Sequence, residues 1–167
     1  EARDALERAR ELAPDSATAW TGTGELALAE GRTADAEDAF RRALERNPDL
    51  ISAALPLAAL LRSRRELVAS RDVLASVLEA APEFVAGWND IGLTLDMLQD
   101  SAGAEKAYLR AISLAPEWGM PDQNLASLLL KAGRVDEAAE RFERAQALVP
   151  TLLEAKMGLG IARARQG

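Results

Sequence analysis

The segment "RNPDL" at residues 46–50 contains a proline that no neighbouring turn signal explains. Its reason becomes visible along the chain, where prolines recur at a constant interval of 34 residues. Five of the seven prolines fall on this lattice, at Pro14, Pro48, Pro82, Pro116 and Pro150. A constant interval of this length indicates a chain built from one repeated structural unit.

Other residue types follow the same period when the sequence is written in rows of 34. Trp20 then falls above Trp88, and the rows need no gap. Two columns hold small residues: Gly24, Ala58, Gly92, Ala126 and Gly160 in one, and Ala2, Ala36, Ser70, Ala104 and Ala138 in the other. A column of large residues holds Leu6, Phe40, Leu74, Tyr108 and Phe142. This alternation predicts helices that approach closely, with the large side chains and the tryptophans filling the gaps.

Each row contains two helical patterns with a breaker between them. We expect Gly31 and Gly133 to adopt the left-handed conformation just past a first helix, and Thr33 and Ser101 to cap a second helix. The lattice proline then ends the second helix, because it lacks a backbone N–H and disfavours helical geometry in the residue before it. The segment around Pro48 is therefore predicted to separate two helical hairpins.

The order Trp, Gly, Ala, aromatic, Ala, Pro on a 34-residue period resembles the tetratricopeptide repeat family. Complete repeats are recognised at residues 17–50, 51–84, 85–118 and 119–152, with half-repeats at 1–16 and 153–167. The resemblance implies an all-α fold: a right-handed α-solenoid of ten helices, paired as antiparallel hairpins in one array over residues 1–167.

Two rows depart from the family pattern. The second row has Ala54 in the tryptophan column and Pro56 inside its expected first helix, where we expect it to bend or loosen the helix. The fourth row has Asp122 in the tryptophan column, and Pro121 is expected to open the helix. Neither change breaks the period.

The composition excludes several classes of function. The chain has neither cysteine nor histidine, which removes disulfides, most zinc and iron sites and most nucleophile–base pairs. We therefore expect no enzyme activity and no cofactor. The net charge of −7 disfavours nucleic-acid binding, and no apolar run approaches the length of a membrane span. The composition favours a soluble protein, and the excess of arginine over lysine favours a bacterial source.

The resemblance implies a protein-interaction module whose first helices line a concave groove suited to an extended peptide or a helix. The groove residues expected from the helix register are Asn89, Asp90, Leu93, Met97, Gln123, Asn124, Ser127 and Lys131. Their amides suit the backbone of an extended peptide, since each both donates and accepts, and methionine provides an adaptable apolar lining. The alternative is that these are merely solvated polar residues. Some family members bind a C-terminal carboxylate through cationic residues in the groove. Here the corresponding positions hold residues such as Thr21, Leu55 and Asp90, so we do not expect this kind of clamp.

The leading hypothesis is therefore a scaffold or adaptor that binds protein segments. A second is a substrate-recruiting or regulatory arm of a larger enzyme, such as a transferase with its catalytic domain elsewhere. A third, RNA recognition by a helical-hairpin array, is disfavoured by the net charge. The cluster "RSRR" at 62–65 suits a phosphate or an acidic partner, but a solvated turn explains it more simply.

The two ends of the sequence predict weak head-to-tail self-association. An unpaired second helix is expected from about residue 2 to 12, and an unpaired first helix from about 154 to 165. Leu159 and Ile161 would leave an apolar face on the last helix, which the first helix of another copy would cover.

Overall fold

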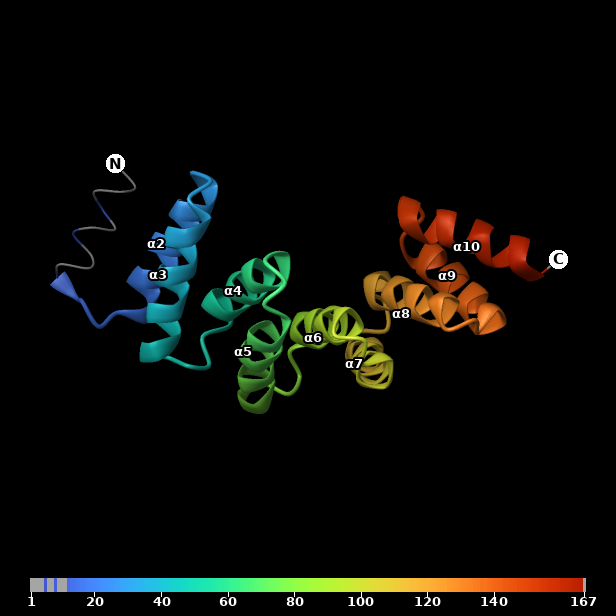
Figure 1. The fold of residues 1–167 in the computed structure, drawn as a ribbon, viewed down its shortest axis with the longest axis horizontal. Coiled ribbons are helices and arrows are strands. Elements are labelled where there is room, and N and C mark those ends of the chain that lie inside the picture. Colours follow the sequence, from blue (N-terminus) through green and yellow to red (C-terminus); the bar gives the residue numbers. More distant parts are fainter. Residues whose placement is uncertain (1–4, 6–7, 9–11, 167) are drawn as a thin grey trace. The chain divides into compact units, whose positions relative to one another are not determined.

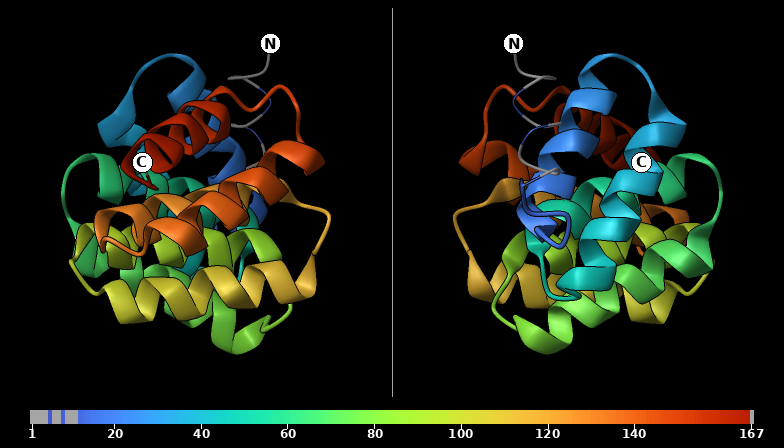
Figure 2. Two further views of the ribbon diagram at one scale, coloured as in Figure 1. Left: turned by 90° about the vertical axis from the view of Figure 1, so that its right-hand side faces the viewer. Right: turned by 90° about the vertical axis from the view of Figure 1, so that its left-hand side faces the viewer.

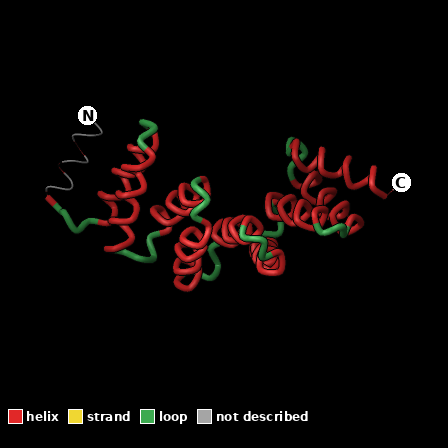
Figure 3. Tube along the Cα trace, in the orientation of Figure 1, coloured by secondary structure: helices red, strands yellow, loops and turns green. Residues whose placement is uncertain are grey.

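The computed structural model describes residues 5, 8 and 12–166, and every regular element within them is an α-helix (Figures 1 and 3). The helices are α2 (Ala17–Ala29), α3 (Thr33–Arg46), α4 (Ile51–Ser63), α5 (Leu67–Ala80), α6 (Val85–Met97), α7 (Ser101–Leu114), α8 (Gly119–Lys131), α9 (Val135–Leu148) and α10 (Leu153–Gln166). The all-α prediction is confirmed. The helix predicted over about residues 2–12 falls almost entirely outside the described residues.

The turn between the helices of a pair has the same geometry in all four complete pairs. Its left-handed residue is Gly31, Arg65, Gln99 or Gly133, with φ between 65° and 77°. The following residue donates its backbone N–H to the carbonyl five positions back, as Asp100 does to Leu95 at 2.9 Å. This hydrogen bond satisfies a carbonyl that the helix end would otherwise leave free. The prediction for Gly31 and Gly133 is confirmed. At the other two turns the left-handed residue is not glycine but Arg65 or Gln99.

The second helices end where the lattice prolines require. Each stops two residues before its proline, and the residue in between is extended; Asn47, for example, has φ −142° and ψ 93°. Pro56 lies inside α4, which nevertheless continues to Ser63. Pro121 lies in the first turn of α8, where its missing N–H leaves no intrahelical bond unmade.

The capping prediction was wrong by one residue. Thr33 and Ser101 are the first helical residues of α3 and α7, and the capping positions are Arg32 and Asp100. The Asp100 carboxylate accepts a hydrogen bond from the backbone N–H of Gly103 at 2.9 Å. A carboxylate one residue before the helix reaches this free N–H directly and also favours the positive end of the helix dipole.

The chain divides into two compact units, residues 1–82 and 83–167. In the first unit, α2 packs on α3 and α4 on α5, and α3 and α4 join the two pairs. In the second, α6 packs on α7 and α8 on α9, while α10 packs on α9 (Figures 1 and 2). The assignment of all 167 residues to a single array stays a prediction.

The core of each unit depends on glycines that face aromatic rings. A β-carbon on Gly92 would lie 2.6 Å from the ring of Tyr108, and one on Gly24 would lie 2.5 Å from the ring of Phe40. Both rings are fully buried. The small and large columns of the sequence therefore meet as predicted, with one helix backbone seated directly on the ring of its partner.

Three sequence expectations about burial need correction. Trp20 and Trp88 are half-buried rather than enclosed fillers. The Trp20 ring lies 4.8 Å from the guanidinium carbon of Arg42, and its Nε1 donates to the Pro14 carbonyl at 3.0 Å. Leu159 is 5% exposed and belongs to the core, because its side chain points into the unit. Ile161 is 48% exposed, so it remains available for the predicted head-to-tail contact between copies, which stays a prediction.

The tryptophan column of the fourth row holds a buried ion pair instead. Asp122 is fully buried, and its carboxylate accepts hydrogen bonds from Arg144 at 2.7 Å and Arg141 at 3.2 Å. Arg144 also donates to the carbonyl of Pro116 at 2.8 Å. A buried carboxylate without such partners would be strongly destabilising. The two arginines of α9 compensate for the burial of this charge.

The two tryptophans therefore lie at the margin of the core. Trp20 and Trp88 leave part of their rings exposed, and the Trp20 ring is covered by a guanidinium group. At Asp122 the arginines of the following helix satisfy a carboxylate without a bulky side chain. At this one position, paired charges between α8 and α9 replace a packing residue.

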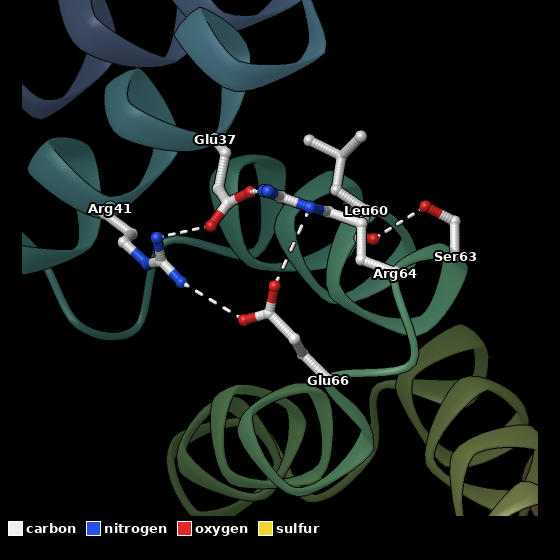
Figure 4. Close-up of polar contacts among 6 residues, drawn as sticks. All are labelled: Glu37, Arg41, Leu60, Ser63, Arg64 and Glu66. Atoms are coloured by element: carbon white, nitrogen blue, oxygen red, sulfur yellow. Dashed lines mark hydrogen bonds and ion pairs between the residues drawn. The ribbon is translucent and has the colours of Figure 1, made fainter.

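Ion pairs also occupy the basic cluster at residues 62–65 (Figure 4). Arg64 contacts the carboxylates of Glu37 and Glu66, and Arg41 contacts the same two carboxylates. Ser63 donates to the carbonyl of Leu60 at 2.7 Å. Arg64 is therefore neutralised within its own unit, which favours the structural explanation of this cluster over a phosphate site.

A second arginine joins α7 to α9 at the surface. Arg134 donates to both carboxylate oxygens of Glu137, at 2.6 and 2.7 Å, and to Glu105 at 2.7 Å. The hydrogen bonds from Arg134 hold the pKa of Glu137 below its usual value. Because folding lowers this pKa, the contact favours the folded state above the ordinary glutamate pKa and is lost as the pH falls through the lowered value.

The close approach at Gly92 predicts opposite effects of one substitution at two positions of the same column. We expect Gly92→Ala to destabilise the protein by about 1–3 kcal/mol, because the new methyl group collides with the Tyr108 ring. A β-carbon on Gly160 would meet no atom within 4 Å, so Gly160→Ala should stabilise α10 by about 0.5–1 kcal/mol. Urea unfolding followed by circular dichroism measures both, and equal effects would show that Tyr108 does not restrict the column.

The left-handed turn residues provide a second matched pair. Gln99 has φ 65°, and we expect Gln99→Gly to raise the free energy of unfolding by about 0.5–1 kcal/mol by relieving backbone strain. Gly133 has φ 77° with open space around it, so Gly133→Gln should lower the free energy of unfolding by about 1 kcal/mol. Thermal melts of the two variants should shift in opposite directions, and shifts of the same sign would contradict the turn geometry.

Candidate functional site

The eight predicted groove residues all lie on two neighbouring helices of the second unit. Asn89, Asp90, Leu93 and Met97 are on α6, and Gln123, Asn124, Ser127 and Lys131 are on α8. Helix α8 lies beside α6 on one side and beside α10 on the other. We call the surface made by these three helices the first-helix face.

Two predicted residues are joined directly across this face. The Nδ2 of Asn124 donates to the Oδ1 of Asn89 at 2.8 Å, which links α8 to α6. Asn89 is only 5% exposed, whereas Asn124 is half-buried. Asn89 therefore supports the surface from below, and Asn124 is the amide that faces outward.

The polar residues beside this pair differ in how their hydrogen bonds are satisfied. The Ser127 hydroxyl donates to the carbonyl of Gln123 one turn earlier, at 3.0 Å. The buried Oε1 of Gln123 has no hydrogen-bond donor among the described residues. A buried amide oxygen without a donor is costly, and this oxygen lies below the surface, where a ligand does not reach it directly.

The charged end of the face is built at the last turns of α8 and α10. The Nζ of Lys131 donates to the carboxylate of Asp96 at 2.6 Å, which joins α8 to α6. Arg165 donates to the carbonyl of Leu130, next to Lys131, at 3.2 Å. Cations at helix C-termini are favoured by the helix dipole, and here they bring two positive groups to one place.

A pocket of about 460 Å³ opens between α8 and α10. Its lining residues are Ser127, Leu130, Lys131, Phe142, Glu154, Met157, Gly158, Ile161 and Arg165. Met157 is 60% exposed and Ile161 48% exposed, although both are large and apolar. Exposed apolar side chains that gather around a pocket mark a place where another molecule would bury them. We call this the α8–α10 pocket.

The structure separates the predicted residues into two groups. Ser127 and Lys131 line the α8–α10 pocket, whereas the other six lie outside its lining. Leu93 is half-buried and packs against the core of its unit, so part of its side chain belongs to that core.

Sequence reasoning missed Phe142 and Glu154 as lining residues, whereas the helix register that gave the groove residues also gives Gly158. The available signal was Gly158, which stands in the column where the row above has Asn124. The missing side chain leaves room for the Phe142 ring, which lies directly against Gly158.

Other kinds of site find no support in the part of the chain that the structure describes. There, no three histidine, cysteine, aspartate or glutamate side chains are grouped as metal ligands. None of the helices from α2 to α10 has the length and apolar character needed to cross a bilayer.

Two family models match most of the sequence. One model described as tetratricopeptide repeat matches residues 1–51 and 124–167, and another with the same description matches residues 85–117. These matches cover more than half of the sequence, and the chain belongs to the tetratricopeptide repeat family. A search of curated proteins finds no match.

Several solved structures share the fold at low sequence identity. The crystal structure of MamA protein has a TM-score of 0.81 at 19% identity, covering 90% of this chain and 82% of that one. YrrB, described as a TPR protein with an unusual peptide-binding site, has a TM-score of 0.79 at 19% identity, covering 97% and 84%. TTC0263, a thermophilic TPR protein of Thermus thermophilus, has a TM-score of 0.75 at 21% identity, covering 95% and 87%. At these identities the likeness concerns the fold, and it confirms a helical repeat solenoid.

The asparagine pair predicts unequal effects at two adjacent positions of α8. Asn124→Ala should cost about 1–3 kcal/mol in the free energy of unfolding, because it leaves the buried Oδ1 of Asn89 without its donor. Gln123→Ala should cost less, since it removes an amide oxygen that has no donor among the described residues. Urea denaturation compares the two variants, and a larger loss for Gln123→Ala would contradict the described pairing.

Proposed function

We propose that the first-helix face binds an extended segment of a partner protein, and that the chain acts as an interaction scaffold. The contacts proposed are Asn89, Asp90, Leu93, Met97, Gln123, Asn124, Ser127 and Lys131, with Asn89 and Leu93 in supporting roles. The α8–α10 pocket carries the proposal, because Met157 and Ile161 expose apolar surface there beside the polar groups of α8. A function in which these residues are merely solvated would not need such a pocket.

The polar groups of α8 support an extended segment as the ligand. The amide of Asn124 is half-buried, and its Nδ2 donates to the Oδ1 of Asn89. An extended backbone presents alternating N–H and C=O groups, so one of its N–H groups can donate to the Oδ1 of Asn124. The similar fold of YrrB, described as having a peptide-binding site, is consistent with this class of ligand. A recruiting arm of a larger enzyme would use the same surface, and the proposal involves no chemical step.

A library of random twelve-residue peptides displayed on phage, selected on the whole chain, tests the proposal. We expect the enriched peptides to lose about tenfold or more in affinity for the Ser127→Trp variant, because the indole fills the α8–α10 pocket. Fluorescence anisotropy with the corresponding synthetic peptides measures the change.

The matched control is Ser113→Trp, which places the same indole on the exposed surface of the second helix α7. Peptides that bind Ser127→Trp normally but lose affinity for Ser113→Trp would place the ligand on the second helices and refute the proposal. Failure to enrich any peptide that is sensitive to Ser127→Trp would also refute it.

A further inference from the structure

On the basis of the proposed function, we propose that the α8–α10 pocket selects one kind of peptide: a short extended segment with an apolar residue between a basic and an acidic residue. The apolar residue would enter the pocket, and the charged residues would meet opposite charges at its two ends. Three features of the described residues support this inference. They are an apolar floor, opposite charges at the two ends of the pocket, and two charged side chains, Glu154 and Arg165, for which the structure shows no internal ion pair.

The floor of the pocket exists because one side chain is missing. A β-carbon on Gly158 would collide with the ring of Phe142, so only glycine fits at this position of α10. The Phe142 ring occupies the position that a side chain on Gly158 would take. Together with Leu130 it lines the pocket between α8 and α10. An apolar side chain of a partner can therefore be buried there.

The two ends of the pocket carry opposite charge. Glu154 lies in the first turn of α10, and Arg165 lies in its last turn. Arg165 contacts the carbonyl of Leu130, so its guanidinium shares one end of the pocket with Lys131. Eleven residues of helix separate Glu154 from Arg165, which corresponds to about 16 Å. An extended peptide covers this distance in about five residues at 3.3 Å each.

Glu154 and Arg165 are the lining charges available to a partner. Among the described residues, Glu154 makes no ion pair, and Arg165 bonds to a neutral carbonyl rather than to a carboxylate. Lys131 is bound to Asp96, yet its side chain remains 65% exposed and can be shared with a second carboxylate. The partner that matches this pattern places an acid near Arg165 and a base near Glu154, in either chain direction.

A purely structural explanation exists for the cations alone. Helix dipoles favour Lys131 and Arg165 at the C-terminal ends of their helices, whatever binds nearby. That explanation does not account for the exposure of Met157 and Ile161 between the charged ends. The structural explanation also makes a different prediction: reversing the charge at position 165 would then leave the preference for a peptide unchanged.

The phage library of random twelve-residue peptides also tests this inference when it is selected on the wild type and on Arg165→Glu. We expect the wild type to enrich an apolar residue flanked, about two or three positions away, by a base on one side and an acid on the other. The variant should enrich bases on both sides. Synthetic peptides of the two kinds should exchange their order of affinity, with about a fivefold preference in each case.

The matched control is Arg163→Glu, two residues away, where the arginine pairs with Glu143 outside the pocket. This variant should select the same peptides as the wild type. Met157→Ser and Ile161→Ser should each weaken binding without unfolding α10, whereas Val68→Ser, at an exposed position of α5, should not.

The outcomes separate this inference from the proposed function. Peptides that are lost on Ser127→Trp but keep their preference on Arg165→Glu would overturn the charge pattern and leave the binding face intact. Peptides insensitive to both changes would overturn both. Peptides rich in acids at both flanks would show that Glu154 plays no part, which also overturns the inference.

Discussion

The contact between a glycine and an aromatic ring is the constraint on which the structure depends. Gly92 has no β-carbon, so the backbone of α6 rests directly on the buried ring of Tyr108 from α7. This brings two helices close enough to pack at native density with few large residues, which suits a chain with 4% aromatic content. The same contact joins α2 to α3 at Gly24 and Phe40.

The first-helix face is a consequence of this packing. Because α7 and α9 cover one side of the first helices, α6, α8 and α10 are left with their other sides side by side. Hydrogen bonds then fix neighbouring first helices to one another, from Asn124 to Asn89 and from Lys131 to Asp96. In the proposed function, a ligand would therefore meet side chains whose positions are already determined.

The 34-residue period is enough to predict the helices, their pairing and the ends of the second helices. A strict period places Gly92 opposite Tyr108 and extended residues before the prolines, and these local rules act within a few residues of chain. It also placed Asn89, Asn124 and Lys131 on one pair of neighbouring helices, because the helix register repeats with the row. Even so, the capping residue at Asp100 was misplaced, since two polar residues compete within one turn and only the hydrogen bond to the Gly103 N–H decides between them.

Tertiary structure alone decided which of these groups remain available to a partner. Leu159 and Ile161 are equally apolar in sequence, yet one is buried and the other exposed, because α10 packs against α9 on a single side. Asn89 is buried and accepts a hydrogen bond from Asn124, which is half-buried and remains partly exposed at the surface. The α8–α10 pocket arose from Gly158 against Phe142, a contact between two helices whose packing no single row encodes. Periodicity specifies each hairpin, whereas the space between neighbouring hairpins depends on the side chains that meet there.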